Sequence, residues 1–338
     1  MRSFPLLVFE KFGQAKPLPK NSTKTIKFRR YFLKDSAFSA SDNGIFSAGS
    51  YFNTDNFDPT KKILTEGQTP AATGLDKQDL YVTLTQFGDR TEISDVVADT
   101  HEDLILQEAI EILGEQAPVL IEKARFNALK AGTNVVRSGS VSLRTSVAAV
   151  FTTNVQRIAT RTLKRQLAKQ ITSTVKSTPS YGTEPIAPSF IAVSHVDLEY
   201  DISKAQGFVP VEKYGNGMAF DGEIGKIGDC RYILTTIAEP WADAGAAVAS
   251  NTQAISTTGV LIDTYPILYL AKDAFGMVPL KGKAAIVPMV VNPKPSDSDP
   301  LAQRGHVSWK TMQATIILNE AWIMRAEVAC TDNAYMTD

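Results

Sequence analysis

The sequence predicts an α+β protein, and three observations carry this prediction. In residues 100–131 apolar side chains recur every three to four positions, which indicates one long amphipathic helix. Residues 154–171 repeat this periodicity and predict a second helix. Most of the remaining chain shows the alternation, or the short apolar runs, that are typical of β-strands. A helix of about 30 residues would be about 45 Å long, which is more than a small domain needs.

The first third of the chain predicts an extended region. Residues 1–24 have no sustained periodicity, so we expect an arm that becomes ordered only against another surface. Residues 24–32 alternate between apolar and polar and predict a strand, and residues 80–87 predict its partner. The polar stretch 35–60 then forms the broad tip of a two-stranded hairpin. Because an isolated hairpin is marginal in water, we expect this one to lie on another subunit.

Sequence signals mark both ends of the long helix. Residues 100–103 are close to a capping box and place acids in the first turn, which suits the helix dipole. Gly132 follows the last periodic residue, at the position that glycine prefers beyond a helix C-terminus. Pro118 lies inside the run and should kink or split the helix.

The second half of the chain predicts short strands separated by turns. A turn-rich stretch at 179–188 marks the boundary, and residues 242–259, rich in Ala, Ser and Thr, predict a loop. The strands are expected at residues 190–193, 231–235, 265–271 and 284–292, followed by a strand-like run at 311–327.

The composition is ordinary for a globular protein, but the charge is unevenly distributed. The 338 residues carry a net charge of −1, whereas residues 1–34 hold nine basic residues against one acidic residue. The rest of the chain is therefore net acidic. Its acidic residues could pair with the basic N-terminal segment of another copy. The sequence contains no run of 18 apolar residues, so it predicts no membrane-spanning helix. Cys230 and Cys330 are isolated in the sequence, which favours thiols of a reducing compartment.

No motif predicts an enzyme, a cofactor site or a metal site. The three histidines are scattered, and His195 could serve a hydrolase as its base, but no GxSxG motif supplies a nucleophile. The glycines of residues 222–228 match no phosphate-binding motif, so turns with positive φ explain them better. Asp297 and Asp299 alternate as in a calcium loop but lack its Gly and its distal Glu.

One charge pattern stands out. Four basic residues follow one another at four-residue intervals on the second predicted helix: Arg157, Arg161, Arg165 and Lys169. Like charges at this spacing repel by about 0.2–0.5 kcal/mol per pair, so the pattern indicates an anionic partner unless the face is simply solvated. The partner could be nucleic acid. It could also be an acidic stripe on the long helix, formed by Glu108, Glu111, Glu115 and Glu122.

Nine sequence blocks carry a resemblance to a known family. They are KTIKFRRY (24–31), LTEGQTPA (64–71), QFGDRTEISDVV (86–97), EILGEQA (111–117), ALKAGTNVV (128–136), TLKRQLAK (162–169), FDGEIGKIGDCRYILTT (220–236), YPILYLAKDAFGMVPL (265–280) and DPLAQRGHVSWKTMQATIILNEAWIMRAE (299–327). In this order they resemble the major capsid proteins of the N-four-type group of tailed phages. The blocks span nearly the whole chain.

The resemblance implies the HK97-like fold of these proteins. Residues 1–23 would be the N-terminal arm, and residues 24–93 the extended β-hairpin loop that overlies a neighbouring subunit. Residues 94–179 would form the peripheral domain with its spine helix at 100–131, and residues 180–299 the axial domain. Residues 300–338 would return to the peripheral domain. The hairpin tip at 35–60 is longer and richer in serine than we expect of the family.

The resemblance also implies a non-enzymatic function. Many copies, as hexamers and pentamers, would assemble in the host cytoplasm into the icosahedral head of a virion around double-stranded DNA. Scaffolding, portal and decoration proteins would be further partners, and a membrane would not. The expected inter-subunit contacts are Lys27, Arg29, Arg30, Glu108, Glu111, Glu115, Arg157, Arg161, Arg165 and Lys169.

Two other functions stay open at this point. One is an encapsulin-like shell of a cellular nanocompartment, and the other is a hydrolase that uses His195. For the basic helix face we favour the acidic stripe over DNA, because a head must let its genome slide during packaging and ejection.

Overall fold

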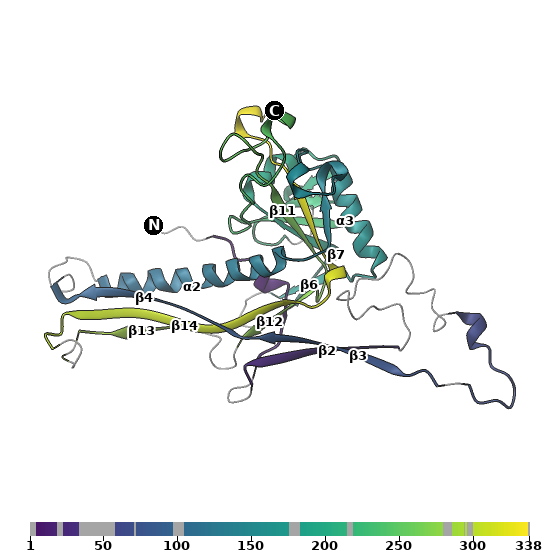
Figure 1. Cartoon of the computed structure of the whole chain (residues 1–338), viewed down its shortest axis with the longest axis horizontal. Helices are drawn as coiled ribbons and strands as arrows, with labels where there is room; N and C mark the ends of the chain where they lie inside the picture. Colours follow the sequence, from purple (N-terminus) through teal and green to yellow (C-terminus); the bar gives the residue numbers. More distant parts are fainter. Residues whose placement is uncertain are drawn as a thin grey trace.

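The computed structural model describes most of the chain, and Figure 1 shows its parts. A compact body stands above a long, low ribbon of strands, a helix lies along that ribbon, and a hairpin extends away from it (Figure 1). The described residues are 5–18, 23–33, 58–70, 72–96, 105–175, 183–214, 219–279, 286–293, 295 and 300–336. Most of the predicted hairpin tip (35–60) lies outside these ranges, as do residues 100–103, Asp297 and Asp299.

An eight-stranded sheet forms the body, in the order β5-β15-β11-β7-β10-β9-β8, with β6 paired to β7. Its strands are β5 (Val135–Arg137), β6 (Ile171–Val175), β7 (Thr183–Ser194), β8 (Phe208–Pro210), β9 (Glu223–Ile227), β10 (Cys230–Leu234), β11 (Tyr265–Leu270) and β15 (Ile323–Val328). A short helix, α4 (Glu199–Ser203), follows β7. Helix α3 (Thr153–Arg165) buries Val155, Ala159 and Leu163 in the core of this sheet, because these residues share one helix face.

A five-stranded sheet forms the ribbon, and β14 is its longest strand. The strands are β1 (Gln14–Ala15), β4 (Thr85–Ser94), β12 (Phe275–Pro279), β13 (Val287–Val291) and β14 (Arg304–Ile317). Strand β4 pairs with one edge of β14, and β12 and β13 pair in succession with the other edge. Helix α2 (Ile105–Lys130) lies along this sheet (Figure 1), where Leu113 and Ala117 pack with Ile93, Val307 and Trp309.

The long helix predicted from the sequence is present, but Pro118 does not split it. Helix α2 runs as one element from Ile105 to Lys130 with Pro118 inside. A proline inside a helix costs about 3 kcal/mol, because it removes a hydrogen bond and its ring meets the preceding turn. Ala117 and Ile121 are buried beside it, so packing of both halves against the sheet offsets that cost.

The predicted hairpin is present as a two-stranded sheet of β2 (Thr25–Leu33) and β3 (Leu75–Thr83). Its base packs on the ribbon, since Ile26 and Phe28 are buried in one cluster with Val278 of β12. A Cβ at Gly276 would lie 2.9 Å from Cζ of Phe28, so this close contact requires a glycine. The far part of the hairpin extends away from the body (Figure 1).

The second strand of the hairpin was predicted with the wrong bounds. The predicted strand 80–87 spans two real strands, because the chain changes partner at Leu84. The amide of Leu84 donates to the carbonyl oxygen of Lys24 at 3.0 Å, and its side chain is buried. After Leu84 the chain leaves β2 and pairs with β14 as β4. The alternation of apolar and polar residues continues through Leu84, so the sequence pattern did not reveal the boundary between β3 and β4.

The N-terminal segment packs on its own subunit, so the prediction that it needs another surface was wrong for residues 5–18. Val8 and Phe9 are buried against α2, and their amides donate to Oε1 of Glu122, each at 2.5 Å. Strand β1 then adds in parallel to the edge of β12. The segment is therefore held in place in two ways. Its apolar side chains are buried against α2, and its strand β1 pairs with the ribbon.

The second helix ends earlier than predicted. Helix α3 stops at Arg165, because Leu167 adopts a positive φ of 57° and reverses the chain. The amide of Ala168 donates to Leu163 O at 3.0 Å, and the amide of Leu167 donates to Lys164 O at 3.1 Å. This is a Schellman motif, with leucine where glycine is usual. Lys169 therefore lies beyond the helix and does not continue its basic face.

The predicted final strand at 311–327 is two strands in different sheets. Strand β14 ends at Ile317 in the ribbon, and β15 begins at Ile323 in the body. A 3-10 turn, Glu320–Trp322, separates them. Asn319 caps this turn, because its Oδ1 accepts a hydrogen bond from the amide of Ala321 at 3.1 Å.

In the described part of the chain, the polypeptide passes between the two sheets at three neighbouring places. The crossings are residues 131–134, residues 271–274 and residues 318–322. The amides of Leu318 and Asn319 donate to the carbonyl oxygen of Ala274, at 2.9 and 3.2 Å. The amide of Thr133 donates to Oε2 of Glu320 at 3.0 Å. Hydrogen bonds thus join all three crossings.

Candidate functional site

No three His, Cys, Asp or Glu side chains within the described residues lie close enough together to hold a metal ion. Across the same residues, no helix has the length and apolar character needed to cross a membrane.

His195, the candidate base, is occupied in capping a turn. Its Nδ1 accepts a hydrogen bond from the amide of Asp197 at 3.3 Å, and Tyr265 donates its hydroxyl to Oδ2 of Asp197 at 2.8 Å. The nearby thiol of Cys330 lies 3.2 Å from Asp197 O, and burial raises its pKa. Burial also raises the pKa of the Cys230 thiol. Both thiols are therefore protonated at neutral pH.

The surfaces of the molecule therefore provide the candidate site, and the exposed face of the hairpin is the first of them. Arg29 binds Asp79 on the opposite strand through two hydrogen bonds of 2.7 and 3.0 Å. Nζ of Lys27 lies 3.7 Å from the same carboxylate. The hydrogen bond from Arg29 lowers the pKa of Asp79. Two of the predicted contact residues are thus paired within their own hairpin, and Arg30, on its other face, donates to Gln78.

Beyond the hairpin strands lies a segment with large exposed apolar side chains. After the 3-10 turn Pro59–Lys62, Ile63 is 76% exposed and Leu64 is 71% exposed. The segment is drawn far from the body in Figure 1. An adjacent pair of aliphatic side chains this exposed, so far from the core, is typical of a surface that meets a partner.

A groove at the base of the hairpin brings together three of the predicted contact residues. Arg29 and Arg30 from β2 and Lys169 from the segment after α3 line a groove of about 640 Å³ between hairpin and body. Phe28 and Trp322 are among its apolar lining residues. Arg29 and Lys169 are 140 positions apart in the sequence, and no local pattern could have placed them together.

The N-terminal half of α2 carries what we call the α2 acidic face. It consists of Glu108, Glu111, Ile112 and Glu115, which lie at helical spacing on one side. Glu108 and Glu111 are exposed, and Ile112 is 54% exposed. Glu122, predicted as part of this stripe, is instead buried and holds the N-terminal segment.

Polar contacts fix α2 on the ribbon beneath this face. Gln116 donates through Nε2 to Asp89 of β4 at 2.6 Å and accepts from Nε1 of Trp309 on β14 at 3.3 Å. The hydrogen bond from Gln116 lowers the pKa of Asp89. Glu92, further along β4, pairs with Arg90. The helix is therefore bound to β4 and β14, two paired strands of the ribbon.

The outer side of α3 carries what we call the α3 basic face. It consists of Arg157, Ile158, Arg161 and Arg165, which are all exposed. Together with Thr160 and Lys164, its arginines line a shallow hollow of about 420 Å³. Lys164 pairs with Asp229 of the same chain.

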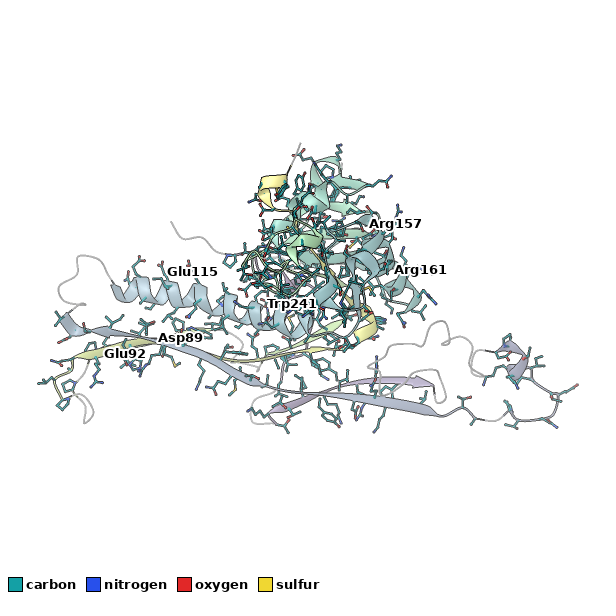
Figure 2. The ribbon with its side chains drawn as sticks, turned by 45° about the horizontal axis from the view of Figure 1, so that its top comes forward. Asp89, Glu92, Glu115, Arg157, Arg161 and Trp241 are labelled. Atoms are coloured by element: carbon teal, nitrogen blue, oxygen red, sulfur yellow. The ribbon has the colours of Figure 1, made fainter. Side chains whose placement is uncertain are left out.

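The two charged faces do not meet within one subunit. Figure 2 shows Glu115 on α2 to one side of the body and Arg157 and Arg161 on α3 at the opposite side. The intramolecular pairing that we considered from the sequence is therefore not formed.

A buried cluster of charges, which the sequence did not reveal, lies where α2 meets the body. The side chain of Glu327 on β15 is fully buried and accepts hydrogen bonds from Arg325 at 3.0 Å, Arg137 at 2.8 Å and Arg144 at 2.6 Å. Burial alone would raise the pKa of Glu327, but the hydrogen bond from Arg144 and the three positive charges lower it. The three arginines come from separate segments, so no sequence spacing predicts this cluster.

Trp241 extends the cluster (Figure 2). The guanidinium of Arg144 lies 3.6 Å from the centre of the indole ring, and Nζ of Lys130 lies 4.0 Å from it. Lys130 also donates to Glu239 O at 2.8 Å. Burial lowers the pKa of Lys130 to about 8. The end of α2 is therefore tied to the body by ionic, hydrogen-bonding and cation–π contacts.

Comparison with known proteins gives one clear result. No family model matches the chain, and no curated protein sequence matches it. Solved structures match it over most of its length. The capsid of Ralstonia phage GP4 aligns with a TM-score of 0.65 and 10% identity, over 95% of this chain and 88% of that one.

Two further capsids align in the same way. The capsid structure of the cyanophage P-SCSP1u has a TM-score of 0.58 and 13% identity, over 98% of this chain and 90% of that one. The head of the Helicobacter pylori bacteriophage KHP40 has a TM-score of 0.58 and 9% identity, over 94% and 87%. At these identities the likeness shows the fold, which is that of phage capsid proteins. The predicted α+β class and HK97-like fold are confirmed.

Proposed function

We propose that this chain is the major capsid protein of a tailed bacteriophage, a non-enzymatic subunit that assembles in many copies into an icosahedral head around double-stranded DNA. The observation that supports this most strongly is the match to phage capsids over almost the full length of both chains. The exposed apolar pair at Ile63 and Leu64, on a hairpin that leaves the body, supports self-assembly independently.

The proposal divides the chain by function. The arm is residues 1–23, and the extended loop is residues 24–93. The peripheral domain is residues 94–179 with 300–338, and the axial domain is residues 180–299. The pairing of β12 and β13 with β14 favours moving these two strands from the axial to the peripheral domain. Strands β5, β6 and β15 pair within the eight-stranded sheet and α3 packs on it, which favours moving these elements from the peripheral to the axial domain. The axial domain is then the eight-stranded sheet with α3, and the peripheral domain is the ribbon with α2.

The partners follow from this function. Other copies of the chain, arranged as hexamers and pentamers, are the main partner, and the packaged genome is contacted without sequence specificity. Scaffolding, portal and decoration proteins are further partners of such a shell. The protein would be assembled in the host cytoplasm and reside in the virion.

Electron microscopy of the purified protein tests this proposal. We expect rings of five and six subunits and closed shells at high protein concentration. Particles from a lysate should contain DNA that is protected from nuclease, whereas an encapsulin-like compartment would contain protein cargo instead. Protein that stays monomeric at every concentration and ionic strength, with and without a crowding agent, would contradict the proposal.

A further inference from the structure

The charges of the α3 basic face need an explanation beyond helix stability. Cations near a helix C-terminus interact favourably with the helix dipole, which accounts for Arg165 in the last turn. Arg157 and Arg161 lie outside the last turn and gain nothing from the dipole. The helix sequence contains no acidic residue, so these arginines repel one another along one side of α3. Ile158, between them, is 44% exposed.

The α2 acidic face resembles the α3 basic face in its arrangement of an isoleucine among charged residues, but its charges are negative. Glu108, Glu111 and Glu115 surround Ile112, which is 54% exposed. The first half of α2, up to Glu122, contains no cation. Glu108 to Glu115 spans about 10 Å along its helix, and Arg157 to Arg165 spans about 12 Å along the other. Each face thus places one isoleucine among three like charges over a similar length.

We infer that the α3 basic face of one copy docks on the α2 acidic face of the next copy. The inference rests on the proposed function, because it requires many copies of the chain. Ile158 and Ile112 form the apolar centre of this contact, and the arginines and glutamates form its charged rim, which is the usual anatomy of a protein interface. Opposite charges also select the partner surface and its orientation.

The contact has to be between subunits, because the two faces lie at opposite sides of one molecule (Figure 2). It joins different patches on the two copies, so it is heterologous. Heterologous contacts close into rings when the rotation between copies allows it. A contact of this kind suits five-membered and six-membered rings equally, since each subunit offers one face to each neighbour.

Nucleic acid explains less of what is observed. Phosphates would neutralise Arg157, Arg161 and Arg165, but they would leave Ile158 against a charged backbone without an apolar partner. A second copy of this chain accounts for both faces and both isoleucines.

Charge reversal tests the contact. One variant carries Arg157→Glu, Arg161→Glu and Arg165→Glu, and a second carries Glu108→Lys, Glu111→Lys and Glu115→Lys. Each turns attraction into repulsion, so we expect the protein concentration needed for assembly to rise by about tenfold or more. A third variant combines all six changes and restores the attraction, so its assembly threshold should return to near that of the wild type. The matched control is Lys213→Glu, an exposed lysine on neither face.

A direct probe covers the case in which a reversed variant does not fold. Ile112→Cys and Ile158→Cys in one chain should give disulfide-linked ladders of subunits on oxidation of assembled protein, and none in dilute monomer. The two native thiols are buried, so they do not compete. Linked ladders would support the contact, and their absence from assembled particles would overturn it.

The remaining outcomes are also decisive. If wild type and all variants assemble at the same concentration, the faces are solvated and the contact is wrong, while the proposed function stands. If the arginine variant assembles normally but loses packaged DNA more readily in salt, the face meets nucleic acid, which also overturns the contact. If the wild type never assembles, the proposed function fails and the contact fails with it.

Discussion

Glu327 shows how one buried carboxylate can hold several segments together. It accepts hydrogen bonds from Arg137, Arg144 and Arg325, which approach it from β5, from the chain before α3 and from its own strand. Each arginine is itself largely removed from water, so removing the carboxylate would leave three positive charges close together without their partner.

Glu327→Gln should therefore destabilise the unassembled subunit by about 3–5 kcal/mol, measured as the free energy of unfolding in urea. Glu92→Gln is the matched control, because its pair with Arg90 is exposed and is worth at most about 1 kcal/mol. Because the pKa of Glu327 is lowered in the folded protein, its contribution is present above about pH 4.5 and is lost as the pH falls through the folded-state value. The variant should lose less stability than wild type on acidification, and an equal loss would argue against this role.

Lys130 predicts a pH dependence of the same sign, in a more alkaline window. Burial lowers its pKa to about 8, so between about pH 8 and 10 the unfolded chain binds a proton that the folded chain has released. Stability should rise with pH in this window. Lys130→Met should flatten the rise, measured as the melting temperature from pH 7.5 to 9.5, and Lys123→Met, at an exposed position on the same helix, should not. The idea fails if the slope is unchanged in Lys130→Met.

At the scale of elements, the end of α3 carries a measurable strain. Leu167 has a φ of 57°, a conformation that costs a residue with a Cβ about 1–2 kcal/mol. Its side chain is 45% exposed, so little packing would be lost on replacement. Leu167→Gly should stabilise the subunit by about 0.5–1 kcal/mol in thermal unfolding. Leu167→Ala keeps the strain and should not stabilise, and a stabilising alanine would refute the argument.

The docking of the hairpin on the ribbon depends on Gly276. A methyl group there would lie 2.9 Å from Phe28, so Gly276→Ala should push the base of β2 away from β12. We expect a loss of about 1–3 kcal/mol. Hydrogen exchange should be faster in β2 and β3 but unchanged in α2. Gly114→Ala serves as the control, because a Cβ there meets nothing within 4 Å, and equal effects of the two changes would exclude the docking explanation.

The sequence predicted elements well where the evidence is local. The apolar period of α2 and the alternation of β2 survive in the structure because each repeats along one face that is buried. The misplaced boundaries lie where the chain changes partner without a change of pattern, at Leu84 and at residues 318–322. The end of α3 was missed because leucine occupies the position where glycine would have marked it.

The candidate surfaces were predictable only in part. The basic and acidic residues of α3 and α2 could be read from helical spacing, which fixes the face on which each one lies. Their separation across the molecule, the pairing of Lys27 and Arg29 with Asp79, and the burial of Glu122 could not. Each of these depends on contacts between residues far apart in the chain.

At the scale of the whole molecule, assembly should depend on the segment beyond the hairpin. Ile63 and Leu64 are exposed, so Ile63→Asp with Leu64→Asp should leave the melting temperature of the unassembled subunit unchanged. The double variant should form few or no closed shells, because these side chains lose their apolar partner in a neighbouring copy. Val260→Asp, also at an exposed position, is the control. Normal shells from the double variant, seen by electron microscopy, would rule out this role.

The three hydrogen-bonded crossings between the sheets lead us to expect that the body and the ribbon move relative to each other about a single hinge. Because residues 131–134, 271–274 and 318–322 are joined to one another, the body cannot tilt relative to the ribbon by bending one crossing alone. Tilting has to bend all three together, about a common axis. In a shell that places copies of this chain at positions of different curvature, only the angle between the body and the ribbon would then differ from copy to copy. Superposed subunits from five-fold and six-fold positions should differ by a rigid rotation about that axis, with each sheet unchanged inside.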